Sequence, residues 1–498
     1  MAKVTEIYLL STPFTLKQNE TILFPDRSSQ HEYMEGRIKH SYNNFSMQRQ
    51  NRTIKVPDFI DDIFDSNYLM YRNSQNGKWY YCFITGYEYI NDNCTEISFK
   101  FDVLQTYMFD YRIKPCLIER EHVNNDTIGI HTVDEGISIG EFKRYQRYFS
   151  TGLTDLVYIV GSKYRVDDEG TVLQMATRRN DIISYIQYAK FEKTEYLELK
   201  NYIDTIEKAK ENSILFVSAI PRFCLEESSI VDRYVQISTK IPTKKIEPVI
   251  DMETISGYTP KNNKLFIYPY NSLILSNCSQ ERLLKIENFL PNDVIFYAQT
   301  MLSPQPTMKI IPYLYKHVIF NYEESLDFNY FPQCEYTTDA YKNFLNSSIS
   351  GIFTNVLSTG VNLYTGNYVG AVLNATNAAV NLNSYNLKSD NLMGTGVDGQ
   401  LSLLAKEDFR LFQQQIKPEY AEIIDKFFSR YGYKVDIIGI PNITGRENFN
   451  YVKTKDCLCV GDIPSTNLEE IQNIFDSGIT FWHNIENYGD YTIDNPIV

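Results

Sequence analysis

The chain has 498 residues, 43% hydrophobic and 22% charged, and its 62 acidic against 48 basic residues give a formal net charge of −14. This length corresponds to several domains, and the composition excludes a globally disordered chain. The acidic balance excludes a protein that holds nucleic acid through a general positive surplus. It suits a passage through which DNA slides, because acidic walls repel DNA rather than retain it.

The aromatic and cysteine content narrows the class of protein further. Phe, Tyr and Trp make up 14% of the chain, which favours strands and large buried or interfacial surfaces. The eight cysteines are scattered, which indicates free thiols of a protein made in a reducing cytosol. Only Cys457 and Cys459 lie close together, and their spacing predicts two thiols on one side of a strand rather than a zinc site. We expect no signal peptide and no conventional membrane span.

The first hundred residues are expected to form strands. Residues 78–90 are aromatic and β-branched, and residues 91–93 supply a turn. After the turn, apolar side chains alternate with polar ones, at Ile97, Phe99, Phe101 and Val103. This period of two predicts a half-buried hairpin.

The middle of the chain mixes helix and strand signals. An apolar face predicts an amphipathic helix over 192–210, formed by Leu199, Tyr202, Ile203 and Ile206. Strands are expected at 213–220, 233–238 and 264–276, with Pro269 indicating an edge or a bulge in the last of them. The polar connection at 240–263, punctuated by prolines, is interpreted as a boundary between subdomains.

The C-terminal part predicts two helices and a strand. The first helix covers 418–430 and ends at Gly432, with an apolar face of Ile423, Ile424, Phe427 and Phe428. A strand follows at 435–440. Thr466 and Glu469 have the spacing of a capping box and are expected to open a helix that closes near Gly478.

The motifs that suggest catalysis lack their context. Gly394, Gly396 and Gly399 satisfy G-x-G-x-x-G, but an Asn- and Ser-rich segment precedes them instead of the strand that dinucleotide binding requires. Acidic side chains crowd one segment, at Asp58, Asp61, Asp62 and Asp65, and are interpreted as solvated surface rather than a glycosidase pair. The six histidines are dispersed. We therefore expect no catalytic residues, no cofactor and no metal.

The feature with the most information is a stretch without charge. From Asn343 to Leu387 there is no Asp, Glu, Lys, Arg or His, and apolar residues recur at helical spacing in two halves around Gly366. Each half would span about 30 Å as a helix, the thickness of a hydrocarbon core. The opposite faces carry Asn, Ser and Thr, which can be wetted or buried against further copies in lipid. Membrane insertion, a buried helical hairpin and an Asn/Ser-rich linker all remain open on this pattern.

Several sequence islands resemble the tail-knob, or distal tail tube, proteins of small short-tailed phages of the picovirus type. They are FDVLQTY at 101–107, IEREHV at 118–123, YPY at 268–270, FNYVKTKDC at 449–457, GDI at 461–463 and a long run at 470–483. The islands reach both ends and the middle of the chain. This resemblance implies a structural virion protein without enzymatic activity.

The resemblance also implies how such a protein acts. It implies a homohexameric ring around a channel that conducts genomic DNA without sequence preference, in contact with a lower collar or tail tube and a tail tip protein. It further implies that hydrophobic loops plug the channel and then form a pore in the host cytoplasmic membrane. The protein would be made in the host cytoplasm and reside in the virion tail. Its membrane-active loop would be 343–387, with the apolar residues Ile349, Ile352, Phe353, Val356, Leu357, Val361, Leu363, Tyr364, Val369, Val372, Leu373, Val380 and Leu382.

Together these observations predict a β-dominated α+β chain of tube-like barrel or sheet domains that form a ring, with a long inserted hydrophobic helical loop. The expected parts are β-rich 1–123, mixed α/β 124–255, β-rich 256–342, the loop 343–405 and α/β 406–498. The alternative functions are a tail-associated wall hydrolase and a receptor-binding tail tip.

Overall fold

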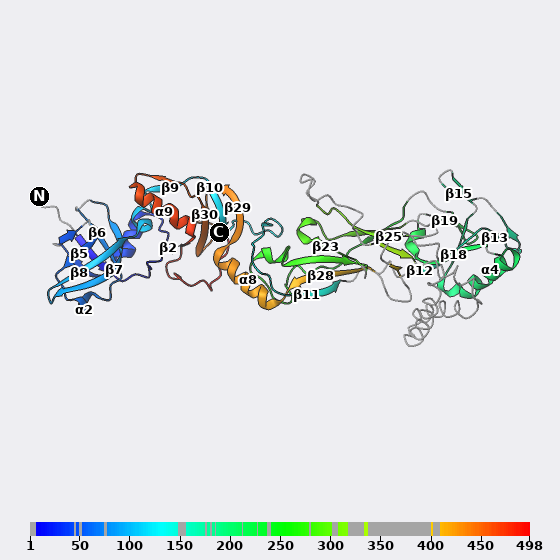
Figure 1. Cartoon of the computed structure of the whole chain (residues 1–498), viewed down its shortest axis with the longest axis horizontal. Coiled ribbons are helices and arrows are strands. Elements are labelled where there is room, and N and C mark those ends of the chain that lie inside the picture. The colour runs from blue at the N-terminus through cyan, green and yellow to red at the C-terminus, as the bar shows by residue number, and fades with distance from the viewer. Residues whose placement is uncertain are drawn as a thin grey trace, which may run out of the picture. The chain divides into compact units, whose positions relative to one another are not determined.

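The computed structural model divides the chain into two compact units. It describes residues 6–43, 46–48, 52–73, 77–147, 156–174, 177–179, 182–184, 186–211, 213–226, 228–236, 241–277, 280–300, 307–316, 333–336, 400–401 and 409–498. Unit 1 contains Met1–Ile139, Pro260–Lys264 and Glu419–Val498, and unit 2 contains Gly140–Thr259 and Leu265–Pro418. Sheets dominate both units, which confirms the prediction of a β-dominated fold (Figure 1).

Unit 1 begins with a seven-stranded antiparallel sheet in the order β3-β1-β6-β7-β8-β5-β4. Its strands are β1 (Glu6–Leu10), β3 (Ile38–Tyr42), β4 (Ser46–Gln48), β5 (Thr53–Val56), β6 (Tyr68–Arg72), β7 (Tyr80–Asn91) and β8 (Cys94–Phe101). The predicted hairpin is confirmed, because β7 and β8 pair and Ile97 and Phe99 are buried. The continuation to Val103 is wrong: Asp102 accepts a hydrogen bond from the Gln105 backbone N–H at 3.0 Å and caps helix α3 (Val103–Tyr107).

The second sheet of unit 1 joins the two ends of the chain. Its order is β2-β32-β30-β10-β29, and β2 runs parallel to β32. Its strands are β2 (Glu20–Ile22), β10 (Cys116–Glu121), β29 (Tyr433–Gly439), β30 (Phe449–Lys455) and β32 (Ile479–Trp482), and a separate pair is β9 (Tyr111–Ile113) with β31 (Cys459–Gly461). The helices of unit 1 are α1 (Arg27–Glu35), α2 (Ile60–Ile63), α3, α8 (Pro418–Tyr431, whose first residue belongs to unit 2) and α9 (Ser465–Ser477). One hydrophobic cluster contains Leu10 and Tyr68 from the first sheet and Phe449 and Trp482 from the second, so the two sheets share a core.

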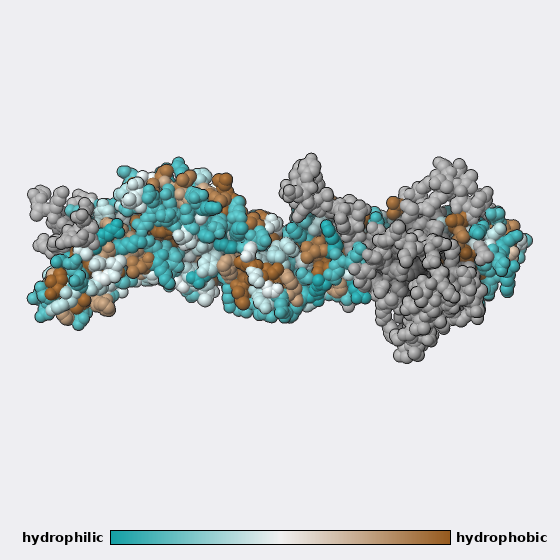
Figure 2. Space-filling view, in the orientation of Figure 1, coloured by the Kyte–Doolittle hydropathy of each residue, from teal (hydrophilic) through white to brown (hydrophobic). Residues whose placement is uncertain are grey.

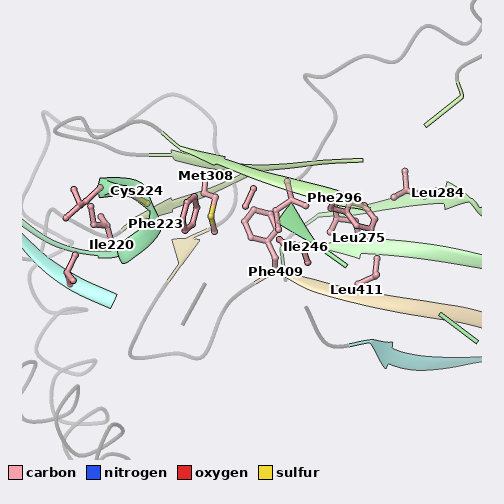
Figure 3. Packing of buried hydrophobic residues seen from close by; sticks show 14 of the residues in the cluster. Ile220, Phe223, Cys224, Ile246, Leu275, Leu284, Phe296, Met308, Phe409 and Leu411 are labelled. Atoms are coloured by element: carbon pink, nitrogen blue, oxygen red, sulfur yellow. The ribbon is translucent and has the colours of Figure 1, made fainter. Parts of the chain in front are cut away.

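The described residues of unit 2 form three larger sheets. The first is formed by β11 (Phe142–Arg147), β28 (Arg410–Ile416), β22 (Asn271–Ser276) and β23 (Glu281–Lys285). The second is formed by β18 (Ile214–Pro221), β12 (Leu156–Ser162), β17 (Gln187–Phe191), β20 (Tyr234–Gln236) and β19 (Ser229–Val231). The third is formed by β21 (Thr243–Ile246), β24 (Phe296–Thr300), β25 (Thr307–Pro312), β26 (Gln333–Tyr336) and β27 (Gln400–Leu401). Two smaller strand pairs are β13 (Arg165–Val166) with β14 (Val172–Leu173) and β15 (Thr177–Arg179) with β16 (Ile182–Ser184). The helical elements here are α4 (Tyr196–Ala209) and the 3-10 turns η2 (Lys193–Glu195), η3 (Arg222–Leu225), η4 (Asn263–Phe266, shared with unit 1) and η5 (Ile286–Asn288). Figure 3 shows Ile246, Leu275 and Phe296 packed with Phe409 and Leu411, so side chains of the first and third sheets form one core.

The amphipathic helices were largely predictable. Helix α4 buries Leu199, Tyr202, Ile203 and Ile206, as expected. Helix α8 ends where Gly432 adopts a positive φ of 65°, also as expected, although Ile423 on its predicted apolar face is 65% exposed. Gly478, with φ of 91°, ends α9.

Two expectations about the ends of elements are wrong. The segment 264–276 is a strand only from Asn271, because η4 and a turn precede it. Thr466 lies inside α9, which begins at Ser465 after Pro464 without a side-chain cap, so the capping box does not form. The segment 240–263 contains the boundary expected of it, because the chain passes from unit 2 to unit 1 between Thr259 and Pro260, although its first part forms β21, which pairs with β24.

Candidate functional site

The predicted membrane-active loop lies outside the described residues, as do the three glycines of the G-x-G-x-x-G motif. The strands that flank it are described. β26 precedes the loop, β27 follows it, and the two strands pair in parallel at one end of the third sheet of unit 2. Glu335 pairs with Gln400, and Tyr336 pairs with Leu401.

This pairing brings the two ends of the insertion together. Paired strands lie about 4.8 Å apart, so residues 337–399 leave and rejoin the sheet at one place. β26 also pairs with β25 through Met308 and Cys334, which ties the base of the insertion to the sheet. The base is therefore a closed attachment point on a packed sheet.

The strongest electrostatic feature of unit 1 is a buried ion cluster at Glu135. Its side chain and that of Lys264 are almost completely buried, and the carboxylate pairs with Lys264 and with Arg120. It also accepts a hydrogen bond from the Lys434 backbone N–H at 3.0 Å. Burial lowers the pKa of Lys264, and the charge of Glu135 opposes that shift. The cluster fixes three chain segments that are far apart in the sequence, which is a structural role.

Sequence patterns missed this cluster. Lys264 stands at the start of an apolar run that was interpreted as a strand, and its charge in that position was the one available signal. The same segment is held to α8 by the buried Asp425, which accepts hydrogen bonds from the backbone N–H groups of Lys261 at 2.9 Å and Asn262 at 3.0 Å.

His122 lies buried in the same unit in its neutral form. Its Nδ1 accepts a hydrogen bond from the Tyr451 backbone N–H at 2.8 Å, so the proton is on Nε2, which lies 3.1 Å from the Ser429 carbonyl oxygen. Burial lowers the pKa of His122 to about 3, and the charge of Arg446 acts in the same direction.

Acidification is therefore expected to destabilise unit 1 through His122. Below the unfolded-state pKa of about 6.5 the unfolded chain binds a proton that the folded chain excludes until about pH 3. The free energy of unfolding then falls by up to about 1.4 kcal/mol per pH unit as the pH decreases through this window. Urea unfolding followed by tryptophan fluorescence at several pH values measures this change in the free energy of unfolding, because both tryptophans, Trp79 and Trp482, lie in unit 1.

The control for this pH dependence is His122→Gln, which removes the titrating group. Burial raises the pKa of Asp102 to about 6, so the contribution of Asp102 to the free energy of unfolding increases as the pH falls. This contribution is the same in the wild-type chain and in the variant, and it cancels when the two are compared. Equal pH slopes in the two chains would contradict the assignment to His122.

The other predicted candidates do not form a chemical site. Asp58 accepts a hydrogen bond from the Tyr42 hydroxyl, and Asp65 lies 3.9 Å from both Lys39 and His40. Cys457 and Cys459 are buried free thiols with their Sγ atoms 3.8 Å apart, on one side as the spacing predicts, although only Cys459 belongs to a strand. In the part of the chain that the structure describes, His, Cys, Asp and Glu form no group suited to a metal ion. Nor does any helix within the described ranges combine the length and apolar character needed to cross a membrane.

Two family descriptions match this chain. Residues 236–496, more than half of it, match the family described as Bacillus phage phi29, tail knob protein gp9, C-terminal domain. Residues 3–112 match the family described as caudoviral major tail protein N-terminus. The two matches cover sequence from both units.

Individual relatives align along nearly the full length. The tail knob protein gp9 of Bacillus phage B103 is 25% identical, with 99% of this chain and 98% of the relative covered. The tail knob protein gp9 of Bacillus phage phi29 is also 25% identical, with 98% of each chain covered. The solved structure of the bacteriophage C1 tail knob protein gp12 has a similar fold, with a TM-score of 0.67, 14% identity, and coverage of 99% of this chain and 100% of that one.

Proposed function

The chain belongs to the family of phage tail knob proteins. From this premise we propose that it conducts DNA during genome ejection, and that it carries a loop that first plugs the channel and then enters the host membrane. As a tail knob protein it is a structural component of the virion tail rather than an enzyme, and it associates with other tail proteins. The loop is residues 343–387.

The closed base of the insertion is the observation that carries this proposal. A segment whose two ends meet on one packed sheet can change its surroundings without unfolding that sheet. The absence of charge from Asn343 to Leu387 removes the largest cost of entering hydrocarbon. An insertion with a long charge-free stretch, attached at one place on a packed sheet, is what a plug that becomes a pore requires.

The polar faces of the two halves require several copies. Asn, Ser and Thr side chains in lipid are satisfied by one another or by water in a lumen, so a single loop cannot shield them. A homohexameric ring provides six loops at one end of a channel. The channel also hides the apolar faces from water before ejection.

The acidic balance of the chain supports a conduit. With a net charge of −14, the protein repels rather than binds the DNA backbone where its acids face the lumen. The lower collar, the tail tip and the host cytoplasmic membrane are the partners that such a conduit joins.

A peptide of residues 343–387 is expected to release dye from liposomes at micromolar concentration. Its apolar faces, with Ile352, Phe353, Val356 and Leu357 in the first half, would insert into the bilayer, while its amides line the defect. The measurement is carboxyfluorescein release at neutral and mildly acidic pH.

The matched control peptide carries Ile352→Asp and Val356→Asp, which places charge on the apolar face at unchanged length. Release should fall at least about tenfold, since each charge at the membrane centre costs about 2.5–3.5 kcal/mol. Liposomes that stay intact at high concentration of the unmodified peptide would count against a membrane role for this segment.

A further inference from the structure

Unit 1 carries exposed apolar side chains on a strand at the end of its second sheet. β29 pairs with β10 on one side and is the last strand of the sheet. Ile438 is 81% exposed, its register partner Leu117 on β10 is also exposed on the same face, and Ile440, Leu458 and Val460 are exposed on the neighbouring turns and strand. Edge strands of soluble proteins are usually protected by charge. In unit 2, β11, also the last strand of its sheet, is protected in this way by the exposed Lys143 and Arg144.

Cations flank this surface, which we call the apolar-basic patch. Arg112, Lys114 and Lys455 are exposed and form no ion pair with any other described residue. Lys434 and Lys453 are neutralised by Asp436 at 3.2 Å and by Glu119 at 2.9 Å. Asp456 and Asp462 lie on the same turns, so the patch is mildly positive within a chain of net charge −14.

A second exposed surface of unit 1 has the opposite character. Around α2 and the β7–β8 turn, Phe64 is 70% exposed and Tyr89 is 50% exposed. Their rings pair with neighbours, Phe64 with Tyr87 at 5.8 Å and Tyr89 with Phe59 at 6.0 Å between centroids, so the aromatic surface is preformed. Figure 2 shows apolar surface both here and near β29.

Carboxylates flank these rings, and we call this surface the aromatic-acidic patch. Asp61 and Asp62 on α2 are exposed and form no ion pair within the described part of the chain, and the exposed Asp92 accepts a hydrogen bond from the Tyr89 hydroxyl at 2.6 Å. The patch therefore has a strong acidic surplus around large exposed aromatic side chains, which are the residue types enriched at interfaces.

We propose that the aromatic-acidic patch of one copy binds the apolar-basic patch of the next copy. The two patches are complementary in charge and both are apolar at their centres, so contact would bury both and pair cations with carboxylates that lack partners in the single chain. The two surfaces are different, and the contact is therefore head-to-tail, the kind that closes a ring when the rotation between copies permits. This proposal rests on the ring in the proposed function and identifies the surfaces that would build it.

Charge reversal in the full chain tests the contact. Lys114→Glu with Lys455→Glu makes both patches acidic, and Asp61→Lys with Asp62→Lys makes both basic. Each variant alone should associate at least about tenfold more weakly, because like charges then face each other. A mixture of the two variants should associate again, since the basic patches of one fit the acidic patches of the other in alternation. Mass photometry and sedimentation velocity measure the assembly.

Two matched controls change the same total charge elsewhere. Lys208→Glu with Lys210→Glu alters the C-terminal end of α4, and Asp168→Lys with Glu169→Lys alters the β13–β14 turn, all at exposed positions of unit 2. Neither should change association. Unchanged thermal unfolding of every variant shows that the folds are intact.

The outcomes separate this contact from the ring itself. A mixture that regains assembly supports the contact. An oligomer that resists both reversals, or a mixture that remains dissociated, overturns the contact and leaves the ring standing. A wild-type chain that stays monomeric at high concentration overturns both.

Discussion

Deleting residues 346–386 is expected to leave the tail assembled and to reduce infection to background. The deletion lies wholly between β26 and β27, so the Glu335–Gln400 and Tyr336–Leu401 pairing at the base is retained. The shorter insertion changes the free energy of loop closure by only about 1 kcal/mol, in the favourable direction. The ratio of plaque titre to particle number measures the effect, with electron microscopy to count intact tails.

The control replaces 346–386 with a Gly/Ser segment of equal length. It preserves the length of the insertion and removes its apolar faces, so it separates the loss of a hydrophobic plug from a spacing effect. Both variants should fail to deliver the genome. Particles that contain either variant and still infect would show that the loop is dispensable.

Local patterns predicted the elements that depend on local chemistry. Two patterns depend only on a few consecutive residues: the alternation at Ile97 and Phe99, and the apolar face of α4 with Leu199 and Ile203. All four of these side chains are buried, as the patterns predict. Gly432 could be identified as a helix end because a positive φ is readily available to glycine. A side chain added there would also lie 2.1 Å from the Glu121 carbonyl oxygen.

Competition between neighbouring signals explains the errors. Val103 continues the alternation of β8, but a capping aspartate at 102 outweighs one more apolar position. Thr466 matches a capping box, yet Pro464 precedes a helix that starts two residues earlier than the motif requires. A short motif identifies a helix more reliably than it identifies its first residue.

Long-range pairing was beyond the reach of these patterns. The parallel contacts of β2 with β32 and of β26 with β27 join short strands separated by most of the chain or by the whole insertion. Nothing in three or four residues specifies such a partner. The attachment of the insertion, on which the proposed function rests, therefore came from the structure, whereas the charge-free stretch proposed as the loop was visible in the sequence.

The ion cluster leads to the second large effect. Replacing Glu135 with Leu is expected to lower the free energy of unfolding of unit 1 by about 3–5 kcal/mol, because the buried Lys264 ammonium loses its carboxylate partner. Arg120 loses the same partner but keeps a hydrogen bond from its guanidinium to the Gly432 carbonyl oxygen at 2.6 Å. Urea unfolding followed by the fluorescence of Trp79 and Trp482 reports on unit 1.

Combining Glu135→Leu with Lys264→Met is expected to recover most of that loss, since a buried ion pair replaced by apolar side chains of similar volume is often nearly neutral in stability. The exposed pair Lys426–Glu422 on α8 serves as the matched comparison, and removing it should cost no more than about 0.5 kcal/mol. A double variant that is as unstable as Glu135→Leu would contradict this account, and the cost would then lie in packing around position 135. A recovered double variant would instead mean that the cluster selects which segments meet in unit 1 and contributes little net stability.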